Sequence, residues 1–191
     1  MTDRAAARGR PRSDQARQAV LAAALELVER DGYTAVTMKG IAEAAGVGRA
    51  TVYRWWPSTG AVLMEALNEL SLRVATPEPT ADPEADLLAF LTATFALNNG
   101  GPARPVLLGL VADGQKDPEV AARVAELISW RRGLLRERLA RLEGDWNVPL
   151  ELVVDMLFGT MWYRMIDLHG PVDATTAREL CTAVAKLAKP D

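Results

Sequence analysis

Three polar side chains stand close together on one short segment, and their types are those that contact nucleic acid. Arg49, Thr51 and Tyr53 lie at the start of the stretch RATVYRWW. A guanidinium group can donate two hydrogen bonds to the major-groove edge of guanine, and hydroxyl groups can donate to phosphate oxygens. A short helix that presents this set in its first turns can reach base edges and phosphates in a major groove. The segment therefore predicts DNA binding.

Two short amphipathic helices and a tight turn are needed to present that segment, and the surrounding sequence supplies them. The stretch from Met38 to Ala45 carries its apolar residues on one side, as a half-buried helix does. Gly46 follows, and glycine takes the positive φ of a turn at no steric cost. The second helix begins at Arg49 and stops before Pro57, because the residue preceding a proline disfavours the α conformation. This spacing is that of a helix-turn-helix.

The composition indicates a globular chain of one large or two small domains with a sizeable core. The chain has 191 residues, of which 49% are hydrophobic. Its apolar runs are shorter than the roughly 18 residues of a membrane span, and its start lacks the apolar segment of a signal peptide. A single cysteine, Cys181, cannot form an internal disulfide. We therefore expect a cytoplasmic protein with Cys181 as a small buried hydrophobe, a redox sensor being the less favoured alternative.

The charges divide unevenly along the chain, although the formal net charge is only −3. Residues 1–60 carry nine Lys and Arg against six acidic residues, whereas residues 61–191 carry thirteen against nineteen. A basic front end on an acidic body restricts attraction to phosphate to the N-terminal part. The acidic overall balance is therefore compatible with DNA binding.

Prolines, glycines and capping residues divide nearly the whole chain into helices, and no segment has the alternation of a β-strand. We expect helices at about residues 13–30, 38–45, 49–56, 59–74, 83–98, 103–113, 118–142, 149–168 and 174–188. Ser13 is the predicted N-cap of the first of them, and Thr37 of the second. The clearest linker is 76–83, with three prolines.

These boundaries predict an all-α fold in three parts. The first is a disordered basic arm, residues 1–12. The second is a three-helix helix-turn-helix domain for DNA binding, residues 13–60, followed by a connecting helix at 59–74. The third is a C-terminal helical bundle for ligand binding and dimerisation, residues 75–191.

A longer ordered pattern surrounds the helix-turn-helix and has no gaps. It reads Gly32-Tyr33, Val36-Thr37, Ile41-Ala42, Ala45-Gly46-Val47, Thr51-Val52-Tyr53, Trp56-Pro57-Ser58 and Leu63. This pattern resembles the TetR family of bacterial transcriptional repressors and is much more specific than a generic helix-turn-helix. The C-terminal two thirds resembles the looser ligand-binding half of that family, chiefly over residues 152–159 and at Tyr163-Arg164.

The resemblance implies a role for each polar residue of the motif. Lys39 stands where the family often has a cation that contacts a base or a phosphate. Arg49 and Ala50 occupy variable base-reading positions, so Arg49 is expected to bond a guanine and Ala50 to pack on a thymine methyl. The implied phosphate contacts are Thr37, Thr51, Tyr53, Arg54 and Trp55. For each polar residue the alternative is an ordinary solvated helix face.

Three positions depart from the family pattern. Thr59 replaces a usual lysine after the recognition helix, which should lower the salt dependence of binding by about one counterion. Trp55 replaces a common histidine, and its indole N–H donates without a charge. Gly48 replaces the usual serine cap, at a cost of a few tenths of a kcal/mol. Trp56 is expected in the core of the DNA-binding domain rather than in a DNA contact.

One helix-turn-helix makes too few contacts for genomic specificity, so such domains normally act in pairs on two half-sites. A stripe on the expected helix 149–168 is the candidate dimer interface: Leu152, Met156, Gly159, Tyr163 and Ile166. Gly159 would let a partner helix approach closely. Burial of the stripe within one monomer is the alternative, and the resemblance favours a two-fold, four-helix interface built by the last two helices.

Aromatic and methionine side chains in the C-terminal part can line an adaptable apolar pocket. The candidates are Phe90, Phe95, Leu107, Leu110, Trp130, Met161, Trp162 and Arg164. Ordinary core packing is the alternative for each of them. The resemblance implies that a small-molecule inducer binds here and changes the separation of the two recognition helices. Arg164 would then indicate the polarity of the ligand, unless it forms a salt bridge with Asp155 or Asp167.

The composition gives little support to an enzyme. The chain has one histidine, His169, and one cysteine, with no CxxC, glycine-rich phosphate loop or serine elbow. The carboxylates at Asp82, Glu84 and Asp86 stand at an expected helix start, where they complement the macrodipole. We therefore predict no carboxylate-based catalysis, no cofactor and no metal site. A helical protein-interaction module is the other alternative, and the basic N-terminal arm argues against it.

The sequence as a whole thus predicts a transcriptional regulator, a repressor that responds to a small-molecule inducer and binds a palindromic DNA operator as a homodimer.

Overall fold

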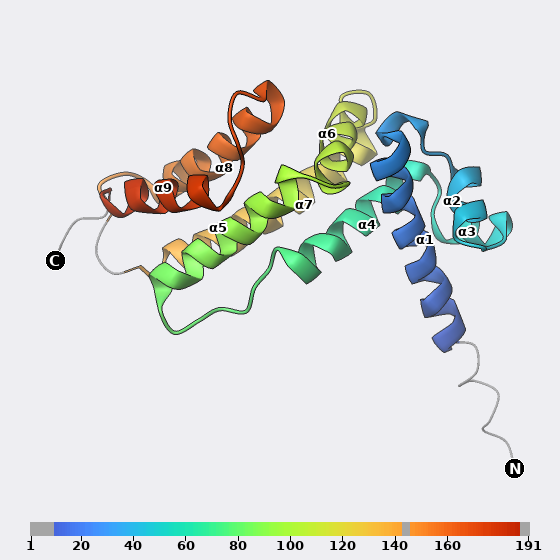
Figure 1. Ribbon diagram of the computed structural model, residues 1–191, viewed down its shortest axis with the longest axis horizontal. Coiled ribbons are helices and arrows are strands. Elements are labelled where there is room, and N and C mark those ends of the chain that lie inside the picture. Colours follow the sequence, from blue (N-terminus) through green and yellow to red (C-terminus); the bar gives the residue numbers. More distant parts are fainter. Residues whose placement is uncertain (1–9, 143–145, 188–191) are drawn as a thin grey trace, which may run out of the picture. The chain divides into compact units, whose positions relative to one another are not determined.

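The computed structural model describes residues 10–142 and 146–187, and all their long elements are α-helices (Figure 1). The helices are α1 (Arg10–Asp31), α2 (Met38–Ala44), α3 (Arg49–Trp55), α4 (Thr59–Val74), α5 (Pro83–Asn99), α6 (Ala103–Gly114), α7 (Pro118–Leu139), α8 (Leu150–Asp167) and α9 (Ala174–Ala185), with a short 3-10 helix, η1 (Tyr33–Ala35). The described segments contain no β-strand, so the predicted all-α fold is confirmed. Among these helices none is long and apolar enough to cross a membrane.

The contacts between residues divide the chain into two compact units. The first unit contains the residues up to Glu69 together with Pro105–Val124, and the second contains Leu70–Arg104 together with the residues from Ala125 onward. The helices α4, α6 and α7 therefore contribute residues to both units. The functional division predicted from the sequence stays a prediction: a DNA-binding domain at 13–60 and a domain for ligand binding and dimerisation at 75–191.

The start of α1 differs from the expectation. Ser13 was expected to cap the helix, whereas the helix begins at Arg10. The physical reason is Pro11, which stands in the first turn, where a missing N–H removes no intrahelical hydrogen bond and the fixed φ suits a helix. The predicted disordered arm is therefore wrong for residues 10–12. Residues 1–9 of that arm lie outside the described segments.

Local capping rules explain the helix-turn-helix. Thr37 caps α2 as predicted, because its Oγ1 accepts a hydrogen bond from the backbone N–H of Gly40 at 3.1 Å. Gly46 has a φ of 63°, the left-handed conformation predicted for the turn. Gly48 is the N-cap of α3 and makes no side-chain hydrogen bond there. The two helices thus begin at defined residues, and this fixes which side chains of α3 face outward.

A fully buried apolar set holds the first unit together. Residues from its successive helices have less than 1% of their surface exposed: Val20, Ala24, Ile41, Val52, Val62 and Leu63. Trp56 is 3% exposed, and its indole N–H donates to Glu65 at 2.8 Å, so the prediction that Trp56 is a core residue is confirmed. Because Trp56 directly follows α3, this contact fixes the end of that helix against α4.

Tyr33 connects η1 to α6 within the same unit. Its ring lies flat on Gly109, where an added Cβ would come within 2.4 Å of the ring. Its hydroxyl donates to the Asp113 carboxylate at 2.5 Å. Burial, the hydrogen bond and the negative charge of Asp113 together raise the pKa of the Tyr33 hydroxyl well above its ordinary value. Tyr33 therefore remains a neutral donor at any physiological pH.

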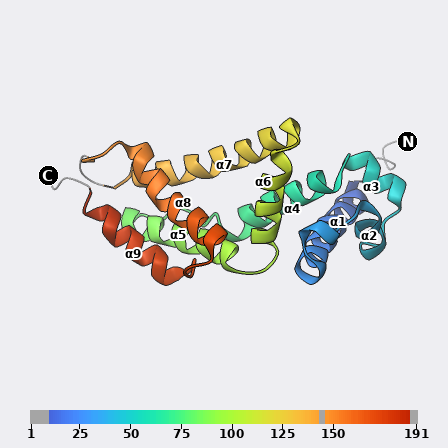
Figure 2. The same cartoon turned by 90° about the horizontal axis from the view of Figure 1, so that it is seen from above.

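The second unit packs α5 against both α8 and α9, and α5 and α9 lie side by side (Figures 1 and 2). Asp82 caps α5 by accepting from the backbone N–H groups of Glu84 and Ala85. The core of the unit includes fully buried side chains from each of its main helices: Phe90, Leu91, Phe95, Leu135, Leu139, Val153, Leu157 and Ala177.

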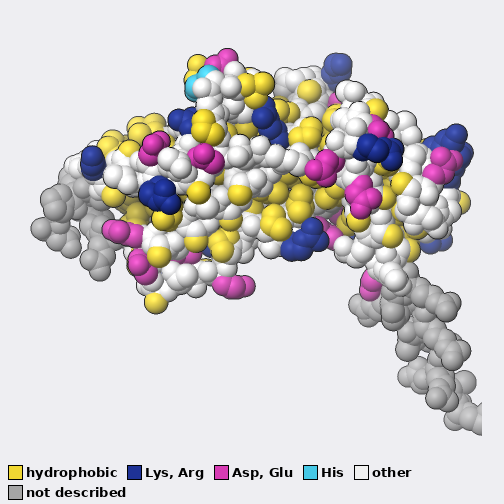
Figure 3. All heavy atoms as spheres, in the orientation of Figure 1, with side chains coloured by type: hydrophobic (Ala, Val, Ile, Leu, Met, Phe, Trp, Pro, Cys, Tyr) yellow, Lys and Arg dark blue, Asp and Glu magenta, His cyan; other side chains and the backbone are white. Residues whose placement is uncertain are grey.

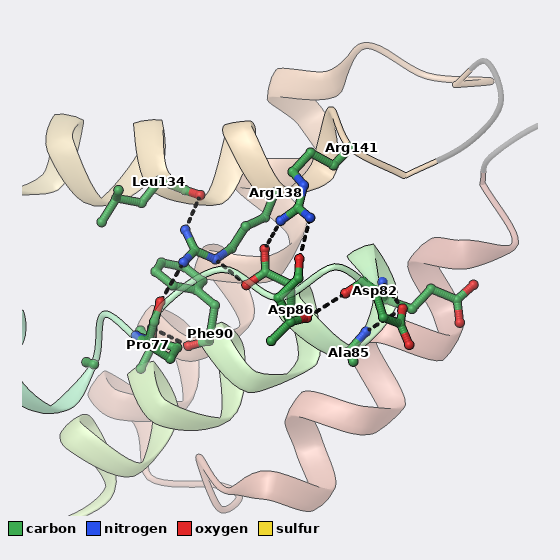
Figure 4. A network of polar contacts seen from close by, with 12 residues as sticks. Pro77, Asp82, Ala85, Asp86, Phe90, Leu134, Arg138 and Arg141 are labelled. Carbon is green, nitrogen blue, oxygen red and sulfur yellow. Dashed lines mark hydrogen bonds and ion pairs between the residues drawn. The ribbon is translucent and has the colours of Figure 1, made fainter.

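Three arginines of α7 and its C-terminal end, here called the arginine ladder, hold the linker between α4 and α5; two of them, Arg138 and Arg141, are labelled in Figure 4. Arg131 donates to the carbonyl oxygen of Ala75 at 2.8 Å, Arg138 to that of Pro77 at 3.0 Å, and Arg141 to that of Thr80. The proline-rich stretch predicted as a linker is thus bonded along its length to arginines of the same unit.

A carboxylate and an aromatic ring complete the ladder. Asp86 is fully buried and forms ion pairs with Arg138 and Arg141. The ring of Phe90 lies near two of the three guanidinium groups, with its centroid 4.6 Å from the guanidinium carbon of Arg131 and 4.5 Å from that of Arg138. Burial, with the nearby charge of Arg138, lowers the pKa of Arg131 to about 10, so it stays protonated at neutral pH. The sequence indicated only that Asp86 complements the dipole of its helix. In the structure Asp86 also pairs with Arg138 and Arg141.

Candidate nucleic-acid interface

The predicted DNA contacts share an exposed surface on α2 and α3. Six of the eight are exposed, and two are partly buried. The exposed set is Thr37, Lys39, Arg49, Ala50, Tyr53 and Arg54, and the partly buried residues are Thr51 and Trp55. The opposite side of α3 carries the fully buried Val52. The helix thus presents its polar side to solvent.

Spacing within α3 places the predicted contacts in two adjacent rows. Arg49 and Tyr53 are four residues apart, as are Ala50 and Arg54, so each pair lies on one side of the helix, one turn apart. Tyr53 is 57% exposed despite being a large aromatic residue, which leaves its hydroxyl accessible. The rows offer two guanidinium groups, a phenol and a methyl group to one surface, the set that base edges and phosphates require.

Thr37 and Trp55 have restricted roles in this arrangement. The Oγ1 of Thr37 already accepts from Gly40, so its hydroxyl has a donor left for a phosphate oxygen. The ring of Trp55 packs edge-on against that of Trp56, with 5.5 Å between the ring centroids. The guanidinium carbon of Arg54 lies 5.9 Å from the centroid of the Trp55 ring. These contacts limit the freedom of Arg54 and Trp55.

An acidic residue that the sequence reasoning did not single out belongs to the same surface. Glu43 of α2 accepts a hydrogen bond from Arg49 Nη2 at 2.8 Å, across the turn of the motif. A signal for it exists in the sequence, because Glu43 is the only acidic residue between Thr37 and Trp56 and lies four residues after Lys39.

The frame behind the interface is a set of polar contacts between α1 and α4. Glu65, which accepts from Trp56, also forms an ion pair with Arg17, and Arg17 pairs with Glu69 at 2.8 Å. Gln18 donates to Glu69 at 2.9 Å. The end of the recognition helix is therefore connected to α1 through α4.

The predicted pocket residues are mostly buried in the cores of the two units. Leu107 and Leu110 belong to the first unit, and the others to the second. Phe90, Phe95 and Leu110 are fully buried, Leu107 and Met161 are nearly so, Trp162 is partly buried and Trp130 is exposed. A separate groove of about 870 Å³ lies between α5 and α9, and its described lining includes Leu87, Leu88 and Cys181 but none of the predicted pocket residues.

Arg164 and Cys181 have local explanations. Arg164 donates to the carbonyl oxygen of Pro171 at 2.8 Å and to Thr176 Oγ1 at 2.6 Å, and so joins the end of α8 to the start of α9. The alternative of a salt bridge with Asp155 or Asp167 is wrong, because these pair with Arg132 and His169. Burial raises the pKa of the Cys181 thiol to about 11, with Glu84 adding to the effect, so the thiol is neutral and partly buried.

The predicted dimer stripe is exposed along the whole of α8. Leu152, Met156, Gly159 and Tyr163 all lie on the surface, and Ile166 is 68% exposed. A Cβ added at Gly159 would meet nothing within 4 Å. The alternative, burial of the stripe within the monomer, is therefore wrong.

Comparison with known proteins decides the family. The family model "Bacterial regulatory proteins, tetR family" matches residues 20–66, and "Tetracyclin repressor-like, C-terminal domain" matches residues 77–184. The chain belongs to the TetR family. The residues that carried the resemblance in the helix-turn-helix all lie within the first of these matches.

Relatives agree with this assignment over most of the length of the TetR-family chain. It is 32% identical over 181 residues to the HTH-type transcriptional regulator YdeS of Bacillus subtilis, covering 91% of this chain and 89% of that one. It is similar to the crystal structure of the TetR family transcription regulator SCO0332, with a TM-score of 0.71, 31% identity and coverage of 92% and 100%. It also shares its fold with FadR of Bacillus subtilis in complex with stearoyl-CoA, with a TM-score of 0.59, 17% identity and coverage of 90% and 99%.

The coarse function follows from this membership. The TetR-family chain is a DNA-binding transcriptional regulator and not an enzyme. The helix-turn-helix on α2 and α3 lies within the matched N-terminal region. Its exposed polar rows are the part of the molecule whose chemistry suits that function.

Proposed function

We propose that this TetR-family chain is a ligand-responsive repressor that binds a palindromic operator as a homodimer. The observation that carries the proposal is the exposed row of Arg49 and Tyr53 on a helix whose opposite side is anchored by Val52 and Trp56. A rigid helix with one donor-rich side fits a major groove, and its first turn reaches the base edges. Arg49 then reads a guanine, and Tyr53 holds a phosphate.

The exposed stripe on α8 supports the homodimer. Leu152, Met156, Tyr163 and Ile166 are exposed and recur along one side of α8, and hydrophobic side chains lie beside the histidine near the end of that helix (Figure 3). A stable monomer rarely exposes such a surface without a partner. Pairing of two copies about a two-fold axis would cover it and would place two recognition helices on one inverted repeat.

A small-molecule inducer is supported by the fold and by one relative. FadR of Bacillus subtilis, which shares this fold, was crystallised with stearoyl-CoA. In this chain, the candidates for contacting a ligand are Trp130, Met161 and Trp162 of the second unit. An inducer acts only if it binds the conformation that fits the operator less well.

Selection of fragmented genomic DNA on the purified full-length protein at physiological salt tests the proposal. We expect enrichment of fragments that share an inverted repeat, because two copies of α3 read two half-sites. Sedimentation of the protein with the enriched duplex should give two chains per repeat. Enrichment of fragments without any repeat, or binding of one chain per site, contradicts the proposal that the protein binds its operator as a homodimer.

Transcription from a promoter that contains the selected repeat separates repression from activation. A repressor lowers the transcript level when the protein is added and releases it when the inducer is supplied. An increase in transcription on adding the protein alone contradicts the repressor role while leaving the DNA-binding role intact.

A further inference from the structure

The inference concerns Glu43, which stands on the proposed DNA-binding surface although its charge opposes phosphate. Its carboxylate accepts from Arg49 Nη2 at 2.8 Å, and more than half of each side chain is exposed to solvent. Glu43 lies at the end of α2 and Arg49 at the start of α3, so the ion pair spans the turn between the two helices.

The fold itself gives little reason for this pair. Exposed ion pairs contribute little to stability, because water screens the charges and both side chains lose conformational freedom. The helix start at Arg49 is set by Gly46 and Gly48, and the relative position of α2 and α3 by the buried Ile41 and Val52. The proposed DNA-binding role of the surface offers a reason for the pair that the fold does not.

The chemistry of a free arginine on such a surface creates a problem of specificity. A guanidinium binds any phosphate at least as readily as it binds guanine, and phosphate contacts strengthen binding to every sequence alike. A carboxylate that occupies Nη2 compensates the charge of Arg49 and restricts the directions in which its remaining N–H groups can point. The arginine then gains less from a phosphate, while a correctly placed guanine edge can still accept hydrogen bonds.

We propose that Glu43 is a specificity-determining positioning residue that restrains Arg49 from phosphate contacts and directs it to a base edge. Glu43 lowers the affinity for DNA in general and raises the ratio of operator affinity to random-sequence affinity. This inference depends on the proposed function, in which Arg49 contacts DNA.

The test measures the dissociation constants of the full-length protein for two duplexes across a range of salt concentrations. One duplex carries the inverted repeat selected by the wild-type protein, and the other is a scrambled duplex of equal length and composition. In Glu43→Gln, we expect affinity for the scrambled duplex to rise about tenfold. The slope of log K against the logarithm of the salt concentration should steepen by about 0.9 for each bound copy, because Arg49 then neutralises one more phosphate. Operator affinity should change less, so the specificity ratio falls.

Two further variants make the result specific to the pair. In an Arg49→Ala background, Glu43→Gln should change affinity for the scrambled duplex by less than about twofold, because a positioning residue acts only through its partner. Glu119→Gln is the matched control, since Glu119 forms a similarly exposed ion pair with Arg123 on α7. That variant should bind both duplexes as the wild type does.

Three outcomes would overturn the inference. One is an unchanged specificity ratio in Glu43→Gln. Another is an equal effect of Glu43→Gln with and without Arg49, which would mean simple repulsion of DNA by the carboxylate. The third is a loss of operator affinity with no change on the scrambled duplex, which would mean that Glu43 contacts a base itself. Failure of the wild-type protein to select any repeat would instead contradict the proposed function.

Discussion

At the scale of single residues, the two main side chains of α3 are expected to act differently although they lie one turn apart. Arg49→Ala should weaken operator binding by roughly 1–3 kcal/mol and relax the preference at one position of each half-site. Tyr53→Phe removes one hydroxyl donor and should weaken binding to all sequences alike. Binding measured on single-base variants of the operator checks both. Uniform loss of affinity in both variants would contradict the assigned roles.

A second residue-scale feature is Leu168, which follows α8 and has a φ of 59°. Glycine is the usual residue in this left-handed conformation, and a leucine there is strained. Leu168 is also 65% exposed, so packing within the monomer does not explain a leucine at this position. We infer that its side chain extends the apolar surface of α8, an extension that sequence periodicity could not reveal because Leu168 lies outside the helical stripe.

Leu168→Gly should therefore have opposite effects on folding and association. Removing the strained side chain should leave the monomer as stable or more stable, by an amount on the order of 1 kcal/mol. Losing an apolar contact should raise the dimer dissociation constant about tenfold. Sedimentation equilibrium measures the second effect, and Leu168→Met is the control because it keeps an apolar side chain. An unchanged dissociation constant in Leu168→Gly would place Leu168 outside the interface.

At the scale of elements, the sequence predicted the caps and turns that depend on residues close together in the chain. The N-cap at Thr37 and the turn at Gly46 follow from side-chain and backbone chemistry within a few residues, and both were correct. The start of α1 at Arg10 was not predicted, because a basic composition that contains glycine and proline is typical of disorder, although Pro11 is acceptable in a first turn. Contacts between distant residues were not predictable in this way. Asp86 meets Arg141 across 55 residues of chain.

The same limit applies to the candidate sites. Periodicity placed Arg49 and Tyr53 on one side of a helix, but the partner of Arg49 lies on another helix and could only be found from the structure. Periodicity also predicted the stripe of α8, yet it could not distinguish a buried from an exposed stripe, because both have the same spacing. Arg164 stands within an apolar helix for a local reason, its bonds to the start of α9.

The arginine ladder allows a prediction about the linker between α4 and α5. Asp86→Asn removes the buried negative charge and leaves Arg138 beside a neutral side chain, so the second unit should lose about 3–5 kcal/mol of stability. Urea denaturation of the full chain, followed by tryptophan fluorescence, measures the loss. Asp155→Asn breaks an exposed pair with Arg132 and is the matched control, with an expected change below about 1 kcal/mol. Equal effects of the two variants would contradict the structural role of Asp86.

At the scale of the whole molecule, operator binding should depend on the surface of α8, although that surface is proposed to contact no DNA. Two linked half-site contacts bind far more tightly than one, because the second contact forms within the complex at a high effective concentration. Ile166 lies on the exposed stripe, and a lysine there would introduce two equivalent positive charges near a two-fold interface. This substitution should therefore abolish the dimer and leave the helix-turn-helix intact.

Ile166→Lys is therefore expected to sediment as a monomer and to bind the full inverted repeat about 10²–10⁴-fold more weakly. Its affinity for a duplex with a single half-site should remain that of the wild type, because α2 and α3 are unchanged. Leu72→Lys is the matched control, since Leu72 is an exposed leucine on α4, outside the stripe. If Ile166→Lys remains dimeric, the interface lies elsewhere. If it becomes monomeric and still binds the full repeat tightly, a single copy suffices, and the proposal that two linked copies bind the repeat is wrong.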